Sequence, residues 1–209
     1  MPHDNRPFLV GLTGGVASGK STVAAMLREH GFEVVQSDLV AHEALAEPET
    51  IRRLTERFGE GILREGRVDR KALGEIVFAD SAARADLNSI VHPRVRARLD
   101  EIVAGCKSET LVIEIPLLFD SGLGDRFDCV ATVEADMDLR LRALMKRDGL
   151  SREQAEARVA SQITERQRRE LAQYVIVNPM EITGLHAEVD RFVSWLHRQE
   201  KRSVKNFTA

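Results

Sequence analysis

The chain has 209 residues, of which 43% are hydrophobic, and a formal net charge of −3 at pH 7. This length predicts one domain with inserted subdomains, and the acidic balance argues against a nucleic-acid binder. No apolar stretch approaches the roughly 20 residues of a membrane span, and residues 1–7 lack the apolar core of a signal peptide. We therefore expect a cytoplasmic protein in which Cys106 and Cys129, which lack metal-binding spacing, form no disulfide.

A short apolar strand, residues 8–12, precedes a loop that fits the pattern G-x-x-x-x-G-K-[ST] in full. The loop and the start of the helix after it comprise Gly14, Gly15, Val16, Ala17, Ser18, Gly19, Lys20, Ser21 and Thr22. Backbone N–H groups and the helix dipole of such a segment form a cradle for phosphate. We predict a nucleoside-triphosphate site in which Lys20 reaches the β- and γ-phosphates and Ser21 ligates Mg²⁺. The flanking strand and helix disfavour the alternative, a chance match in a glycine-rich turn.

Four further apolar runs predict strands at residues 33–36, 110–115, 129–133 and 174–177. Near-continuous apolar runs separated by helices are typical of a parallel sheet that is covered on both faces. We therefore predict a three-layer α/β fold around a five-stranded parallel sheet, with ligands outside the carboxyl ends of the strands. A last helix, residues 184–197, should pack against this sheet through its apolar stripe.

Two helical regions interrupt the alternation. Residues 47–107 contain no convincing strand but carry apolar stripes at helical spacing, which predicts a helical substrate-binding subdomain. Between residues 140 and 169, nine Lys and Arg stand against four Asp and Glu, an excess of +5. This segment is either a solvated helix face or a lid, residues 140–170, that closes over ATP and brings arginines to the transferred group. The capping pair Ser151 and Gln154 predicts a helix start within it. The expected core comprises residues 8–46, 108–139 and 171–198, with flexible termini at 1–7 and 199–209.

Several polar residues are candidates for the chemistry. Asp38 directly follows the second predicted strand, where a carboxylate can accept a hydrogen bond and a proton from an acceptor hydroxyl, or else cap a helix. Arg147 is the arginine expected on the β- or γ-phosphate, or else a surface helix terminus. Asp120 follows the third predicted strand and suits a ligand contact or an indirect contact to Mg²⁺. His92, next to Pro93, stands between two helical stretches and is either structural or part of a substrate site.

Taken in order, five segments resemble the dephospho-CoA kinase family over residues 8–196, nearly the whole chain. They are Gly11-Leu12-Thr13-Gly14-Gly15, Ser37-Asp38, Leu87-Asn88-Ser89-Ile90-Val91-His92-Pro93, Pro116-Leu117-Leu118-Phe119-Asp120 and Met145-Lys146-Arg147-Asp148-Gly149-Leu150-Ser151. The phosphate loop alone is shared by many unrelated NTPases, whereas the ordered set is specific. The resemblance implies a P-loop kinase fold and a reaction in which ATP phosphorylates the ribose 3′-hydroxyl of 3′-dephospho-CoA, giving CoA and ADP.

The resemblance also implies roles for single residues. Asp38 becomes the catalytic carboxylate beside Lys20, and Arg147 becomes a lid arginine that acts on phosphate. The helical insert becomes the CoA-binding domain. The residues implied on the acceptor side are Asp38, His92, Pro93, Leu117 and Asp120. Asn178 is implied near the adenine of ATP.

The chain departs from the family pattern at three positions. Gln36 stands where the family commonly has the first Asp of Asp-x-Asp, so any metal role of that residue is lost. Asp120 replaces a glutamate and is one methylene shorter. Ala143 stands where the family often has an arginine that can stack on adenine. Arg140 or Arg142 could substitute for it, although both should project from other faces of the helix.

Two alternative functions remain at this point. A nucleoside or nucleotide kinase shares the fold, the loop and the lid, but the long insert before the third strand favours dephospho-CoA. A P-loop regulatory NTPase, the alternative from another class, normally selects guanine with Asn-Lys-x-Asp, which the sequence does not contain. We expect ATP, dephospho-CoA and Mg²⁺ as partners, no nucleic acid and no membrane, and a monomer or weak homo-oligomer.

Overall fold

A computed structural model describes residues 6–119 and 123–206 of the chain. The chain divides into two compact units. We call residues 1–35 with 107–209 the sheet unit and residues 36–106 the helical unit. Each unit is described by itself.

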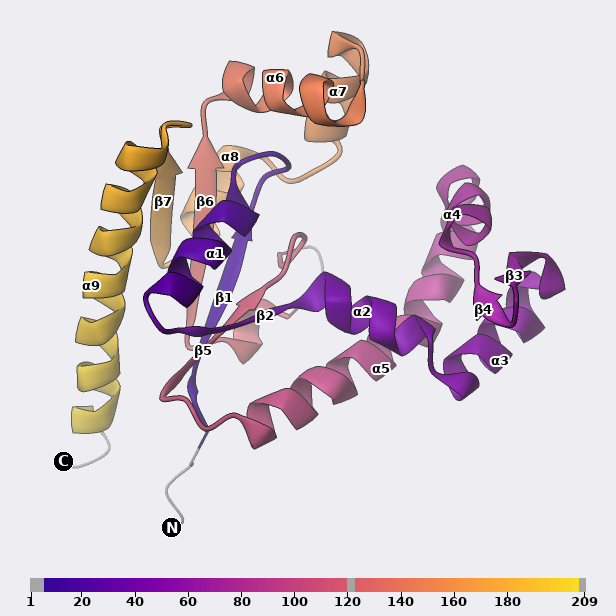
Figure 1. Cartoon of the computed structure of the whole chain (residues 1–209), viewed down its shortest axis with the longest axis horizontal. Coiled ribbons are helices and arrows are strands. Elements are labelled where there is room, and N and C mark those ends of the chain that lie inside the picture. The colour runs from indigo at the N-terminus through magenta and orange to yellow at the C-terminus, as the bar shows by residue number, and fades with distance from the viewer. Residues whose placement is uncertain (1–5, 120–122, 207–209) are drawn as a thin grey trace. The chain divides into compact units, whose positions relative to one another are not determined.

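A five-stranded sheet is the centre of the sheet unit, with strand order β2-β5-β1-β6-β7 (Figure 1). The strands are β1 (Phe8–Gly14), β2 (Glu33–Gln36), β5 (Thr110–Glu114), β6 (Cys129–Ala135) and β7 (Tyr174–Asn178). β1 pairs in parallel with β5 and with β6, and β6 pairs in parallel with β7. Every residue of β5 and β6 is buried, which explains their continuous apolar sequence. The predicted α/β fold with a five-stranded parallel sheet is confirmed.

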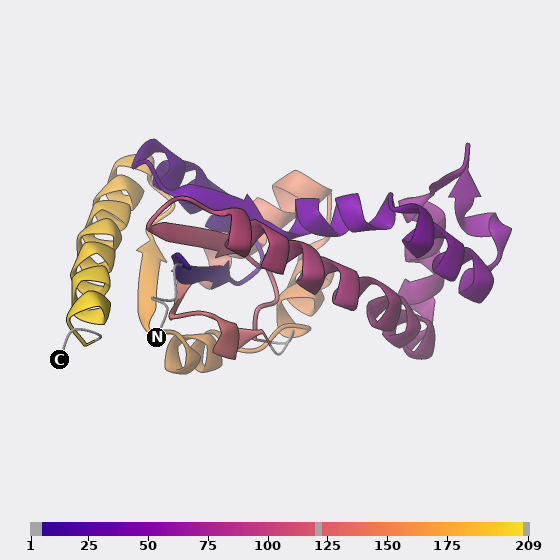
Figure 2. The same cartoon turned by 90° about the horizontal axis from the view of Figure 1, so that it is seen from below.

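Helices cover both faces of this sheet. α1 (Lys20–Glu29) and α9 (Ile182–Asn206) share one apolar core with β1 and β6. α8 (Glu165–Leu171) contacts β6 and lies on the opposite side of the strands from α1 in both views (Figures 1 and 2). The predicted packing of the last helix is confirmed, because Leu185, Val189 and Phe192 are buried in that core. α9 continues to Asn206, past Leu196, where the apolar pattern ends.

A second small core joins the phosphate loop to two helices that follow β6. These are α6 (Met137–Asp148) and α7 (Arg152–Ala160). Their buried residues Leu141, Leu144 and Ala155 pack with Val16 and Ala17 of the loop. α7 starts at Ser151 with the predicted capping box, since Ser151 and Gln154 exchange side-chain-to-backbone hydrogen bonds. The loop therefore shares its apolar contacts with the segment predicted as a lid.

Four helices form most of the helical unit: α2 (Ser37–Leu45), α3 (Pro48–Phe58), α4 (Arg70–Ala79) and α5 (Ser81–Gly105). The prediction that this region contains no strand is wrong, because β3 (Leu63–Arg64) and β4 (Arg67–Val68) form an antiparallel hairpin. Its two-residue turn, Glu65 and Gly66, has positive φ at both positions, 52° and 74°. Strands of two residues are too short to show an alternating pattern.

The expectation that His92 and Pro93 stand between two helical stretches is also wrong. Both residues lie inside α5, which is continuous from Ser81 to Gly105. A proline inside a helix removes one backbone donor and costs about 3 kcal/mol in isolation. Here Ile90 and Val91 before it are buried, and Val95 after it packs against the same core. Burial on both sides of Pro93 keeps the helix whole.

Two expectations from composition can be compared with the described residues. Neither Cys106 nor Cys129 forms a disulfide within this part of the chain. Within residues 6–119 and 123–206, every helix is too short or too polar to span a membrane.

Candidate active site

The phosphate loop, residues 14–19, connects the carboxyl end of β1 to the first turn of α1. Close neighbours dictate its glycines at two positions. A Cβ at Gly15 would clash with the Arg140 guanidinium, and a Cβ at Gly19, where φ is 93°, would clash with the Asn178 amide. Ala17 also has a left-handed backbone, with φ 58°. The loop is thus shaped by side chains behind it as well as by its own sequence.

Lys20 and Ser21 meet a buried carboxylate that the sequence analysis missed. The register pairs Glu114 with Leu12, so the end of β5 lies beside the end of β1. The Ser21 hydroxyl Oγ donates to Glu114 Oε1 at 3.0 Å, and Lys20 Nζ lies 3.5 Å from the same oxygen. Glu114 is only 5% exposed. The signal in the sequence was a lone acidic residue inside an otherwise apolar strand.

This cluster fits a divalent cation that is bound together with phosphate. The Ser21 hydroxyl and the Glu114 carboxylate are hard oxygen donors, the kind that Mg²⁺ prefers. Within the described residues, no three His, Cys, Asp or Glu side chains gather into a metal site. Mg²⁺ typically takes one or two protein ligands and completes its shell with water and substrate phosphates. The two oxygens here match that partial set.

Asn178 supports the loop from the end of β7. Its Nδ2 donates to the Ser18 carbonyl oxygen at 2.8 Å, and its Oδ1 accepts from the Met180 backbone N–H at 2.8 Å. The side chain is buried. Asn178 therefore fixes the backbone of the loop just before Gly19. Asn178 was expected near the adenine of ATP, and the contact that the structure gives it here is to the phosphate loop.

Arg147 lies in the last turn of α6 and is largely exposed. Its guanidinium forms two hydrogen bonds to the Asp148 carboxylate, at 2.7 and 2.9 Å, and Asp148 also accepts from Arg158 at 2.8 Å. The hydrogen bond to Asp148 raises the pKa of Arg147, and the same bond lowers the pKa of Asp148. Arg147 is a cation throughout the physiological range. Asp148, with which it pairs, is exposed as well.

Arg140 and Arg168 are buried, although the excess of charge in this segment suggested a solvated face or a lid. Arg168 forms a two-pronged bond with buried Glu134, with both N···O distances 2.7 Å. Arg140 Nε donates to the Val16 carbonyl at 3.0 Å, while its buried Nη2 has no partner among the described residues. Burial and then Arg168 lower the pKa of Arg140. Counting charges along a sequence cannot separate such buried arginines from exposed ones.

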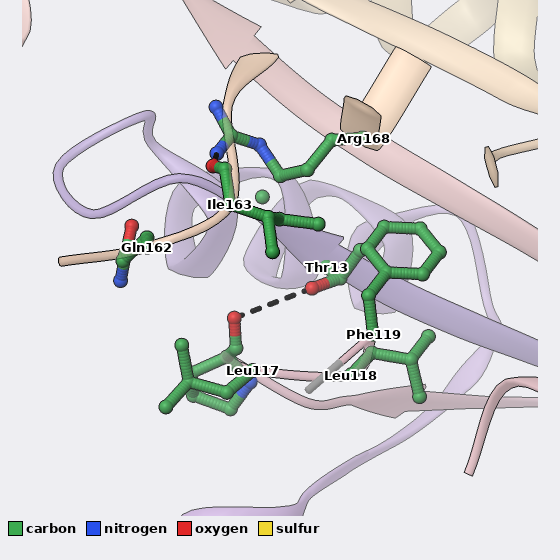
Figure 3. A pocket seen from close by; sticks show the side chains of 9 residues that line it. Thr13, Leu117, Leu118, Phe119, Gln162, Ile163 and Arg168 are labelled. Carbon is green, nitrogen blue, oxygen red and sulfur yellow. Dashed lines mark hydrogen bonds between the residues drawn. The ribbon is translucent and has the colours of Figure 1, made fainter. Parts of the chain in front are cut away.

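A small cavity of about 10 Å³ lies beside the loop, with room for about one water molecule (Figure 3). Its lining comprises Thr13, Gly14, Pro116, Leu117, Leu118, Phe119, Gln162, Ile163 and Arg168. Thr13 Oγ1 donates to the Pro116 carbonyl at 3.3 Å across it. Leu117 is 49% exposed, whereas Leu118 is fully buried. Asp120 lies outside the described residues.

The other acceptor-side candidates belong to the helical unit. Asp38 is exposed in the first turn of α2; the N-cap is Gln36, so the alternative of Asp38 as N-cap is wrong. His92 and Pro93 are exposed on α5. Desolvation of the imidazole by neighbouring chain, and then the charge of Arg96, lower the pKa of His92, which favours its neutral form at pH 7.

Comparisons with known proteins agree with the sequence pattern. A family model described as dephospho-CoA kinase matches residues 8–183. The chain is 40% identical to a dephospho-CoA kinase of Thermobifida fusca, over 93% of this chain and 97% of that one. It is 39% identical to a dephospho-CoA kinase of Bacillus licheniformis, over 93% and 99%.

Solved structures show the same likeness. A dephospho-CoA kinase from Campylobacter jejuni has a TM-score of 0.72 at 29% identity, covering 92% of this chain and 98% of its own. A Thermus thermophilus protein reaches a TM-score of 0.82 at 34% identity, covering 93% and 98%. A shikimate kinase from Acinetobacter baumannii, 17% identical with a TM-score of 0.53, shares the fold alone.

Proposed function

Because the chain belongs to the dephospho-CoA kinase family, we propose that it transfers the γ-phosphoryl group of ATP to the ribose 3′-hydroxyl of 3′-dephospho-CoA. The products are ADP and CoA, which makes this the last step of CoA biosynthesis. The observation that supports it best is the convergence of Lys20, Ser21 and Glu114 at the phosphate loop. We place the reaction in the cytoplasm, with ATP and dephospho-CoA as substrates.

The phosphate loop binds the polyphosphate of ATP. Its backbone N–H groups and the N-terminus of α1 supply partial positive charge, and the Lys20 ammonium adds a full charge. Lys20 Nζ lies 3.5 Å from Glu114 Oε1. When the phosphate binds, the Lys20 ammonium exchanges this carboxylate neighbour for the phosphate oxygens. Phosphoryl transfer depends mainly on position and on charge neutralisation, so these groups can supply much of the catalysis.

Ser21 and Glu114 would hold Mg²⁺, Ser21 through its hydroxyl and Glu114 through its carboxylate. When bound, Mg²⁺ neutralises charge on the phosphate oxygens. Arg147 acts on the γ-phosphoryl group from the lid segment, residues 140–170, and leaves its pair with Asp148 to do so. The exposure of this pair makes the exchange inexpensive, since surface ion pairs contribute at most about 1 kcal/mol.

Asp38 orients the acceptor. Its carboxylate accepts a hydrogen bond from the 3′-hydroxyl, whose oxygen forms the new bond to the γ-phosphorus as the bond to the β–γ bridging oxygen breaks. The proton of the hydroxyl passes to Asp38 late in this step and then to solvent. His92, Pro93, Leu117 and Asp120 complete the acceptor site, His92 as a neutral imidazole.

The experiment measures ADP formation from Mg-ATP with dephospho-CoA, AMP, adenosine, shikimate or water alone, with product masses. We expect rapid turnover only with dephospho-CoA and a product heavier by one phosphoryl group. Lys20→Met should abolish it, and Lys107→Met, an exposed lysine near the opposite end of β5, should not. Turnover with AMP or adenosine instead would make the protein a nucleotide or nucleoside kinase. Equal ADP release in water would make it an NTPase.

A further inference from the structure

Arg140 is the largest fully buried side chain of the described residues, at 1% exposure. Arginine keeps its charge in proteins and offers five N–H donors, so a buried one needs several acceptors. Its Nε has one, the Val16 carbonyl at 3.0 Å. Its Nη2 is buried without any partner within residues 6–119 and 123–206. An unpaired buried donor is costly, so its retention beside the phosphate loop asks for a functional reason.

The backbone of Val16 is held at both its carbonyl and its N–H group. Arg140, from α6, donates to the Val16 carbonyl oxygen, and the Val16 N–H donates to Gln162 Oε1 at 2.9 Å. Gln162 lies between α7 and α8, where it lines the cavity of Figure 3. The two peptide groups that flank the Val16 Cα are therefore each fixed by a side chain, and the two side chains come from separate parts of the predicted lid segment.

The residue before Val16 is adapted to the same contact. A Cβ on Gly15 would clash with Arg140 and would come within 2.9 Å of Arg168 Nη2. Any other residue at position 15 would have to push the ends of these two side chains aside. The contact to Arg140 is thus part of the shape of the loop.

The charge behind the loop is incompletely balanced. Glu134 of β6 is engaged by both prongs of Arg168 and also attracts Arg140, whereas Arg168 itself repels Arg140. Glu165 of α8 adds a weaker attraction to Arg140. A buried cation with an unsatisfied donor, next to a loop that binds polyphosphate, favours the anion-bound state electrostatically.

We propose that Arg140 and Gln162 are positioning residues that hold the backbone of Val16 at its two ends, fix the tip of the phosphate loop and thereby set the affinity for ATP. This inference extends the proposed function, because it makes the predicted lid segment part of the ATP site even before any closure. Arg140 contributes a hydrogen bond and a positive charge, and Gln162 contributes a hydrogen bond alone.

The test measures ATP and ADP binding by calorimetry, without acceptor, for Arg140→Gln, Arg140→Lys and Gln162→Leu. We expect Arg140→Gln to weaken ATP binding on the order of tenfold or more, since a hydrogen bond from a charged donor is lost. Arg140→Lys should recover part of that affinity because it keeps the charge. Arg191→Gln is the control, since it removes the same charge from an exposed position of α9 and should bind ATP like the wild type.

The double variant Arg140→Gln/Gln162→Leu separates positioning from general damage. Two side chains that hold the backbone of the same residue should have non-additive effects on ATP affinity, whereas unrelated losses add. The KM for ATP should rise while the KM for dephospho-CoA stays unchanged. Hydrogen exchange of residues 14–19 should accelerate in both single variants.

The proposal is overturned if Arg140→Gln binds ATP as tightly as Arg191→Gln, or if the two effects simply add. If Arg140→Gln does not fold, Gln162→Leu decides the question by its own ATP affinity and loop exchange, with wild-type values counting against the proposal. ATP binding needs no acceptor, so the ATP affinities still test this inference if the protein does not phosphorylate dephospho-CoA.

Discussion

Asp38 tests the acceptor side of the proposed reaction. In Asp38→Asn the amide can still hydrogen-bond the hydroxyl but cannot take its proton. We expect kcat to fall by a factor on the order of 10² or more, with little change in ATP affinity. Steady-state kinetics with both substrates measure this, and Glu43→Gln, an exposed acid one turn further along α2, is the control. Wild-type kcat in Asp38→Asn would remove the proposed proton acceptor.

Glu114 tests the metal side. Its carboxylate holds the Ser21 hydroxyl at 3.0 Å and is the buried negative charge nearest Lys20. Glu114→Gln should raise the Mg²⁺ concentration for half-maximal activity several-fold, because an oxygen with full charge is lost. The same change should tighten binding of metal-free ATP, because a negative charge that repels phosphate is removed. Titrations with Mg²⁺ and with EDTA separate the two effects.

The control for that pair of titrations is Glu109→Gln, an exposed acid just before β5. It removes the same charge from the other end of the strand and should leave both titrations unchanged. If Glu114→Gln needed no more Mg²⁺ than Glu109→Gln, the carboxylate would serve only to hold Ser21 and Lys20 in place.

At the scale of elements, burial decides what the sequence predicts well. β5 and β6 are buried throughout, so these two strands were readable as continuous apolar runs, and the phosphate loop after β1 was readable as a motif. The hairpin of β3 and β4 was missed because two residues show no period. The expectation of a helix break at Pro93 was wrong because tertiary packing holds α5 together across this local helix breaker.

The parts of the candidate site that the sequence did not predict are those that depend on register and side-chain direction. Glu114 reaches Ser21 because β5 is aligned with β1 in one register, which no local pattern specifies. Arg140 is buried because α6 turns that face toward Val16, while Arg142, two residues on, is exposed. Both belong to the same basic run.

The lid segment supplies a prediction about helix ends. Ser151 caps α7 in a capping box, and replacing such a cap costs about 1 kcal/mol. In Ser151→Ala, amides of α7 should exchange about fivefold faster, because local opening becomes easier by that amount. Ser161→Ala, whose hydroxyl only donates to the Arg158 carbonyl, is the control.

ATP with dephospho-CoA should slow hydrogen exchange across residues 151–169, because a lid that closes over the substrates is protected from solvent. Exchange that is not slowed by the two substrates would contradict a closing lid.

At the scale of the whole molecule, the two cysteines report on different units. Cys129 is buried in β6 of the sheet unit, whereas Cys106 follows α5 at the end of the helical unit and is half-buried. Burial, with a smaller contribution from Asp128, raises the pKa of Cys129 to about 12. Its thiolate, the reactive form, is therefore scarce at pH 7–8 while β6 stays in the sheet. Alkylation of Cys129 requires the sheet unit to open.

ATP should therefore protect Cys129 far more than Cys106. A ligand that binds only the folded sheet unit stabilises it by about 2.7 kcal/mol at 100 times its Kd. Where reclosing outpaces alkylation, the labelling rate follows the open population, so that stabilisation slows Cys129 about a hundredfold. Mass spectrometry of alkylated peptides reads both thiols in one sample, and Cys106 should change little because the phosphate loop lies in the other unit. Equal labelling of Cys129 with and without ATP would mean that the reagent reaches β6 through a local opening that leaves the phosphate loop intact. In that case the loop would not unfold cooperatively with α1, α9 and the sheet.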